Sequence, residues 1–208
     1  MCAGSVDYDL FMTTKTVLVA VLFAIGLTGG EVFAAGGVPP GFTMARTGSI
    51  HDFDYFVGAW TTRQHRQKRP SNQWEDFPAT LCMREYLDGM ATVDELYLPT
   101  KHASGLTLRT FDLKTRQWSI YWVSSARGTL EVPPVVGGFQ GNRGEFYSSD
   151  TDNGRPIKVR YLWLIANHDH ARWEQAFSYD DRTWKTNWTA DFIRGDAATL
   201  CRDGRPKR

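Results

Sequence analysis

Residues 53–60 read FDYFVGAW, a run of aromatic side chains that ends in Gly58-Ala59-Trp60. The polar stretch TTRQHRQKR follows at 61–69, so a large apolar ring stands at the edge of a charged segment. A glycine inside a strand often marks a close approach of another backbone segment. We interpret this stretch as the first strand of a closed β-barrel, with Trp60 filling one end.

Beyond residue 40 the chain shows no long apolar stripe with the 3.6-residue period of a helix. Short segments rich in aromatic and β-branched residues recur instead, with turn signals such as Asp88-Gly89 and Asn153-Gly154 between them. Short connections imply antiparallel neighbours, and closure of the sheet removes its exposed edges. We predict an all-β fold, a single antiparallel up-and-down barrel of about ten strands, with a two-sheet sandwich as the alternative. The predicted strands are 54–66, 73–86, 90–98, 105–112, 118–124, 135–140, 145–149, 157–166, 171–179 and 185–194.

The first 34 residues have the pattern of a secretory signal peptide. Lys15 precedes the apolar run VLVAVLFAIGL at 17–27, and small residues lead to Val32-Phe33-Ala34. The run is shorter than the roughly 20 apolar residues that span a membrane, although a retained N-terminal anchor would show a similar pattern. The mature protein is therefore expected to be secreted or periplasmic, without stable membrane insertion. The predicted order is signal peptide 1–34, lead-in segment 35–52, barrel 53–194 and polar tail 195–208.

Charge and cysteine content narrow the classes of function. The chain has 24 Lys and Arg against 23 Asp and Glu. Nucleic-acid-binding domains usually carry an excess of basic residues concentrated on one face. The near-zero net charge of this chain does not fit that pattern, so we expect no nucleic-acid partner. Removal of the signal peptide would leave Cys82 and Cys201, and an exported protein can keep a disulfide. The sequence leaves open whether these two cysteines pair, and it leaves the oligomeric state open.

Several predicted strands are apolar on one face and mixed on the other, which is typical of a barrel with a partly polar interior. In 118–124, for example, Trp118, Ile120 and Trp122 share one face. We predict that the barrel binds one small, mostly apolar molecule, with the loop 124–134 as a candidate lid. The candidate ligand-binding residues are Arg109, Tyr121, Trp122, Arg160, Trp163, Glu174, Gln175 and Trp188.

Glu174 supports an alternative function. If Arg160 and Glu174 faced inward from adjacent strands, they would pair there, and a buried carboxyl would suit acid–base catalysis. The chain would then be an enzyme of isomerase, cyclase or hydrolase type, with Glu174 as its candidate catalytic residue. If the same side chains point outward, they form cross-strand surface pairs instead. A third alternative is a structural or interaction module with a filled core.

The motif Gly58-x-Trp60, together with Arg194 at the end of the last predicted strand, resembles the lipocalin and calycin barrels. The resemblance implies that Trp60 lies at the closed end, that Arg194 packs across its indole as a cation–π contact, and that Gly58 leaves room for close approach. Residues 50–194 also look like small bacterial proteins of the DUF1579 type, which have a lipocalin-like fold. That likeness implies a fold and no particular activity. It lies in the segments FDYFVGAW, TLRTFDLKTRQWSIYW, ARWEQAFSYDDRTWKTNW and FIR.

His168-Asp169-His170 is the most prominent candidate for a metal site. Two histidines flanking an acid could bind zinc with a third ligand, but the cluster follows Asn167 where a hairpin turn is expected, and turns favour Asn and Asp. We predict a turn and no metal, with His168 and His170 as weak candidates. The haem-binding nitrobindins, related barrels, use a histidine in a late strand. The last predicted strand here, KTNWTADFIR, has none, so we expect no haem and no other cofactor.

Overall fold

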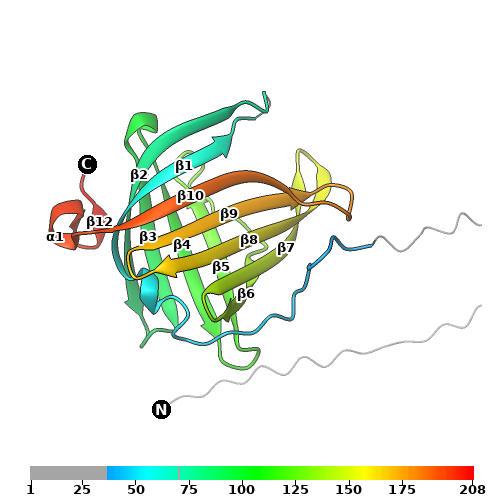
Figure 1. The fold of residues 1–208 in the computed structure, drawn as a ribbon, viewed down its shortest axis with the longest axis horizontal. Helices are drawn as coiled ribbons and strands as arrows, with labels where there is room; N and C mark the ends of the chain where they lie inside the picture. The colour runs from blue at the N-terminus through cyan, green and yellow to red at the C-terminus, as the bar shows by residue number, and fades with distance from the viewer. Residues whose placement is uncertain (1–36, 70) are drawn as a thin grey trace, which may run out of the picture. The chain divides into compact units, whose positions relative to one another are not determined.

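The computed structural model describes residues 37–69 and 71–208 (Figure 1). Ten antiparallel strands run in sequence order around a closed barrel, and the pairing of β1 with β10 completes it. The predicted all-β up-and-down barrel is confirmed, and the predicted signal peptide lies outside the described residues. The strands are β1 (Gly58–Gln67), β2 (Trp74–Tyr86), β3 (Ala91–Leu98), β4 (Ala103–Asp112), β5 (Gln117–Ser124), β6 (Val135–Gln140), β7 (Arg143–Asp152), β8 (Arg155–Asn167), β9 (His170–Ser178) and β10 (Lys185–Gly195).

The aromatic run before Gly58 is the one place where the predicted strands differ in kind from the structure. Residues Asp54–Phe56 were expected to be extended, but they form the short 3-10 helix η1. Phe53 and Phe56 are almost completely buried in the apolar core. Burial of their rings inside one end of the barrel outweighs the extended tendency of aromatic residues, because β propensity depends on the packing environment.

The hairpin between β7 and β8 shows how turn residues set the register of the barrel. Asn153 and Gly154 both have positive φ, at 50° and 79°. Positive φ at both central residues defines the type I′ turn, whose twist matches that of paired strands. The turn places Asp152 opposite Arg155, and the alternation that follows brings Tyr161 opposite Phe146.

The barrel has two different ends (Figure 1). The helix η1 and the turns β2–β3, β4–β5, β6–β7 and β8–β9 lie at one end, which we call the closed end. The opposite end, which we call the open end, carries the remaining connections, including the loop 125–134 and a second short 3-10 helix, η2 (Pro99–Lys101). Within the described residues, no helix is long and apolar enough to cross a membrane.

Residues 37–52, the described part of the predicted lead-in segment, run along the outside of the barrel (Figure 1). The Phe42 ring packs edge-on against Tyr147 of β7, with ring centroids 5.5 Å apart. Arg46 forms an ion pair with Glu145 of the same strand at 3.0 Å. These contacts attach the segment to the outer face before it turns into the closed end.

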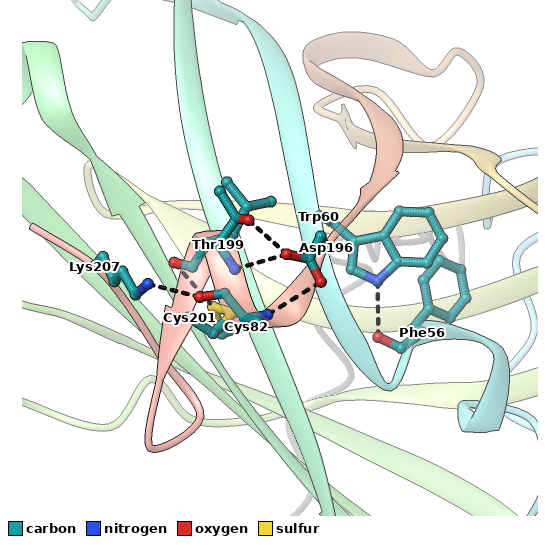
Figure 2. The surroundings of a disulfide bond; sticks show 9 residues. Phe56, Trp60, Cys82, Asp196, Thr199, Cys201 and Lys207 are labelled. Atoms are coloured by element: carbon teal, nitrogen blue, oxygen red, sulfur yellow. Dashed lines mark hydrogen bonds between the residues drawn. A yellow bond between two sulfur atoms is a disulfide. The ribbon is translucent and has the colours of Figure 1, made fainter.

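The predicted polar tail carries regular structure. Cys201 forms a disulfide with Cys82 of β2, with the two Cα atoms 6.1 Å apart, which settles the question that the sequence left open. Figure 2 shows this bond beside Asp196, whose carboxylate accepts a hydrogen bond from the Thr199 backbone N–H at 2.9 Å. The disulfide therefore holds the tail against the barrel wall. The tail elements are α1 (Ala197–Leu200), β11 (Cys201–Arg202) and β12 (Arg205–Pro206).

Candidate functional site

The closed end is built around Trp60 and Arg194. The indole N–H of Trp60 donates to the Phe56 carbonyl at 2.9 Å, and its side chain is completely buried (Figure 2). The Arg194 guanidinium lies 4.1 Å from the centroid of the Trp60 ring, a cation–π geometry. It also donates to the carbonyl of Tyr55 at 2.6 Å and that of Val57 at 3.3 Å. Strand β10 is thereby joined to the segment that enters β1.

Gly58 has a different role at this end from the one that the resemblance implied. A Cβ atom at this position would meet nothing nearer than Arg194 Nη1 at 3.8 Å, which is ordinary contact. Its φ is +116°, a conformation that residues with a side chain rarely adopt. The glycine is therefore required by the bend of the backbone between η1 and β1, and lack of space does not explain it.

Beyond this closed end the barrel contains a cavity of about 260 Å³. This is slightly below the roughly 300–1,000 Å³ typical of pockets for drug-sized ligands, so the cavity suits a small molecule. Leucine, isoleucine and phenylalanine side chains contribute to its wall, and large aromatic rings supply much of the rest. The aromatic residues other than Phe192 whose side chains line it are Trp122, Tyr161, Trp163, Trp173, Phe177 and Trp188, and Tyr121 also borders it.

An ion pair lies at the inner end of the cavity, which we call the floor. Asp94 of β3 and Arg109 of β4 both line the cavity, and Arg109 Nη1 lies 2.5 Å from Asp94 Oδ2. Their side chains are 1% and 3% exposed, respectively. The Arg109 guanidinium also lies 4.8 Å from the centroid of the Phe53 ring, one of the buried aromatic rings of the closed end, so the pair borders that end. Charges buried this deeply are retained only when they are paired.

The side wall of the cavity carries polar groups that are already satisfied. The indole N–H of Trp188 donates to Gln64 Oε1 at 2.7 Å. Gln175 Nε2 donates to Asn187 Oδ1 at 2.8 Å. Burial, with the charge of Asp150 adding to it, raises the pKa of Tyr161 to about 12, so its hydroxyl is neutral at physiological pH. Apart from Glu131 at the open end, the wall above the floor is therefore uncharged and largely apolar.

Charged side chains surround the open end. The Arg66 guanidinium lies 4.9 Å from the centroid of the Trp188 ring and forms an ion pair with Glu75 at 3.1 Å. Lys101 also pairs with Glu75. Burial alone would raise the pKa of Glu75, but the hydrogen bonds from Lys101 and Arg66 outweigh it and lower that pKa below its usual value. These side chains form an ionised rim beside the cavity.

The loop 125–134, part of the candidate lid, borders the cavity at the open end. Glu131 contributes to the cavity wall, and its backbone N–H donates to the Trp122 carbonyl at 2.8 Å. An isolated bridge between Val123 and Leu130 also ties the loop to β5. The loop lies where a lid would have to lie, and it is attached to a strand of the cavity wall.

Six of the eight candidate ligand-binding residues line the cavity. Tyr121 sits between Ile120 and Trp122 along β5, so its side chain belongs to the outer face even though the residue borders the cavity. The register of β4 and β5 explains the inward position of Trp122, which lies opposite Thr107. The six residues are Arg109, Tyr121, Trp122, Trp163, Gln175 and Trp188.

The other two candidates, Arg160 and Glu174, are not brought to the cavity. Glu174 lies on the opposite face of β9 from Gln175, and its carboxylate accepts a hydrogen bond from Arg172 Nε at 2.9 Å. Arg160 stacks on Trp184, with 4.9 Å from guanidinium to ring centroid. Arg160 and Glu174 therefore do not form the inward pair on which the enzyme alternative depended. Consecutive residues of a strand point to opposite faces, so Glu174 and Gln175 cannot both face the interior.

The sequence interpretation missed Asp94, the most informative polar residue in the cavity. A usable signal was present, because Asp94 shares the period-two face of Leu96 and Leu98 in the segment ATVDELYL. A single carboxylate on an apolar strand face implies a buried partner. The partner is Arg109, which the sequence did indicate.

His168 and Asp169 form the turn between β8 and β9, and His170 begins β9. His168 Nδ1 lies 2.6 Å from Asp169 Oδ1, and His170 Nδ1 lies 3.1 Å from Asn167 Oδ1. All these residues are exposed. Among residues 37–69 and 71–208, no group of three His, Cys, Asp or Glu side chains could hold a metal ion.

Comparison with known proteins does not assign the chain to a family. No protein-family model matches the chain, and no curated protein matches it. The likeness to lipocalin-type and DUF1579-type proteins therefore rests on the quoted residues and on the barrel itself.

Proposed function

We propose that this chain is an exported lipocalin-like protein that binds one small, mostly apolar molecule inside its barrel. The observation that carries the proposal is the cavity of about 260 Å³, walled by aromatic rings and bordered by a loop at the open end. Apolar cavities with a few placed polar groups are the common form of small-molecule sites. The signal-peptide pattern of residues 1–34 supports export.

The packing of the aromatic residues argues against a filled core. Trp60 and Trp118, near the closed end, have no exposed surface. Trp122, Trp173 and Trp188 point into the same barrel and yet remain only half-buried. A side chain directed into an interior keeps accessible surface only where neighbouring atoms do not fill the space. This difference supports a binding site over a purely structural interior.

The binding role is also better supported than the enzyme with Glu174 as acid or base. That mechanism needs the Glu174 carboxylate within reach of a bound substrate. Glu174 does not line the cavity, and its carboxylate is bonded to Arg172 on the outer face. We therefore propose a carrier or binding protein.

A fluorescent probe tests this proposal directly. The mature chain, residues 35–208, would be titrated with N-phenyl-1-naphthylamine, a neutral apolar dye whose emission rises in apolar surroundings. We expect saturable binding of one dye per chain. Ala190→Leu would fill part of the cavity, because Ala190 lines it and is buried, and should weaken binding at least about tenfold.

The matched control is Thr186→Leu, an exposed position on the same strand that does not line the cavity. It should leave dye affinity unchanged. Absence of saturable binding by the unmodified chain, or equal affinities for Ala190→Leu and the unmodified chain, would contradict an interior site. Native mass spectrometry of the protein from its own host would complement this test by detecting any molecule that is bound and lost on denaturation.

A further inference from the structure

We propose that the ligand carries an uncharged hydrogen-bonding head, such as a hydroxyl or a carboxamide, which docks on the floor of the cavity. This inference rests on the proposed binding function and goes further, because it names the chemical class of the ligand. The Asp94–Arg109 pair carries the inference through its position, its unused hydrogen-bonding atoms and its charge.

The position of the pair makes it available to a ligand. Asp94 and Arg109 come from neighbouring strands, with Asp94 opposite Thr107 in the register of β3 and β4. Both residues line the cavity although each is at least 97% buried. A molecule that fills the cavity to its inner end therefore meets this pair.

Hydrogen-bonding capacity at the floor is left over. Five buried side-chain polar atoms have no partner among the residues that the structure describes, and three of them belong to residues that line the cavity: Asp94 Oδ1, Arg109 Nε and Trp163 Nε1. Of these three atoms, one is an acceptor and two are donors. A buried polar group without a partner is unfavourable, so such groups call for an explanation. A small head that both donates and accepts would satisfy them.

The charge of the floor selects against ionic heads. Asp94 and Arg109 compensate each other, and the remaining charged residue of the cavity wall, Glu131, forms an ion pair with Arg127 at the rim. A carboxylate or an ammonium group at the floor would thus be buried without a counterion of its own. Burial of an unpaired charge is strongly unfavourable, whereas burial of a hydroxyl or an amide is tolerated once it is hydrogen-bonded.

A matched set of small molecules tests the head group. Phenylpropanol, phenylpropanamide, butylbenzene, phenylpropanoate and phenylpropylammonium share an apolar body and differ in the head. Each would be used to displace N-phenyl-1-naphthylamine from the mature chain at pH 7. We expect the alcohol and the amide to bind at least as tightly as butylbenzene, and at least about tenfold more tightly than either ion. In a cavity without a polar floor, butylbenzene would bind best because it is the most hydrophobic, and that order would overturn the proposal.

A variant that changes the charge of the floor provides a second test, because ligand hydrophobicity alone cannot produce its expected result. Asp94→Asn keeps the size of the side chain and leaves the Arg109 charge uncompensated, so phenylpropanoate should bind at least about tenfold more tightly than to the unmodified chain. Binding of phenylpropylammonium should weaken. The control is Glu95→Gln, a change at the next residue of β3, whose side chain does not line the cavity and pairs with Arg208. It should leave the order of the five molecules unchanged.

The outcomes separate this inference from the proposed function. If the dye binds but the five molecules follow hydrophobicity alone, or Asp94→Asn leaves phenylpropanoate binding unchanged in a folded protein, the polar floor is wrong and the binding function stands. If the dye itself does not bind, both fall. Should Asp94→Asn fail to fold, as judged by circular dichroism, the order of the five molecules on the unmodified chain decides.

Discussion

The two ends of the barrel use the same kinds of side chain in opposite ways. At the closed end, Trp60 is completely buried and its indole N–H is bonded to the Phe56 carbonyl. In the cavity, Trp173 keeps accessible surface, and the indole N–H of Trp163 has no partner among the described residues. The closed end is packed as a protein core, while the cavity beyond it has accessible aromatic surface and polar atoms without hydrogen-bond partners. Stability and binding are thus assigned to different parts of one aromatic interior.

The largest difference between the two ends should appear when a tryptophan is removed. Trp60→Ala should lower the free energy of unfolding by about 3–5 kcal/mol, because it leaves a large hole in a fully packed region. Trp173→Ala should cost about half as much or less, since its ring borders an existing cavity. Urea denaturation followed by circular dichroism measures both. Equal losses for the two variants would show that the ends do not differ in packing.

Arg194 offers a sharper test of the closed end. Arg194→Gln removes the guanidinium from the Trp60 ring and from the Tyr55 and Val57 carbonyls, and should cost about 2–3 kcal/mol. The control is Arg172→Gln in β9, an outer-face residue paired with Asp191 and Glu174 and 41% exposed. Exposed ion pairs contribute little, so this variant should lose no more than about 1 kcal/mol. A similar loss for both would remove any special role for Arg194.

Gly58 tests whether backbone conformation matters at the closed end. Gly58→Ala forces a residue with a side chain to φ +116°, and strain of this kind costs about 1–3 kcal/mol. Gly37→Ala is the control, because its added methyl group meets no atom within 4 Å and its φ is not strained. Dye binding at the far end of the barrel should be unaffected by either change. If Gly58→Ala were as stable as the unmodified chain, the backbone between η1 and β1 could change its conformation without a loss of stability.

The smallest expected effect lies at the open end and depends on pH. The folded pKa of Glu75 is held below its ordinary value of 4.5, so its ionised form stabilises the fold above that pH. The contribution should decline as the pH falls below about 4.5 through the folded pKa. Glu75→Gln should therefore be less stable than the unmodified chain at pH 7 and approach it at low pH. Thermal unfolding across pH 2–7 checks this, with Asp76→Asn, an exposed neighbour on the outer face, as the control.

Much of this fold was predictable from the sequence because its signals are local. Turn residues such as Asn153-Gly154 set the register of a hairpin by themselves, and each strand carries its own alternation. The bend of Asp54–Phe56 into η1 was not predictable in this way. It depends on the rings of Phe53 and Phe56 meeting the far side of the barrel, a contact that no local pattern contains.

The sequence predicted site residues correctly only where the side chain itself indicates that it faces the barrel interior. Trp122, Trp163 and Trp188 were found because large apolar side chains on an alternating strand mark the interior. Glu174 was misplaced although the alternation was readable, because Trp173 and Phe177 share the period-two face of Gln175 and mark that face as the interior. Asp94 was overlooked because a carboxylate suggests surface until its partner on the next strand is known.

The pairing of β1 with β10 also has consequences for how the chain folds. These two strands are the first and the last of the barrel, so the contact between Trp60 and Arg194 is among the most distant in the sequence. Contacts of this kind slow folding, because a long loop must close before they form. Until β10 is in place, both edges of the growing sheet remain open to strands of other molecules. Chains that end before β10 should consequently aggregate, however well their first nine strands pair.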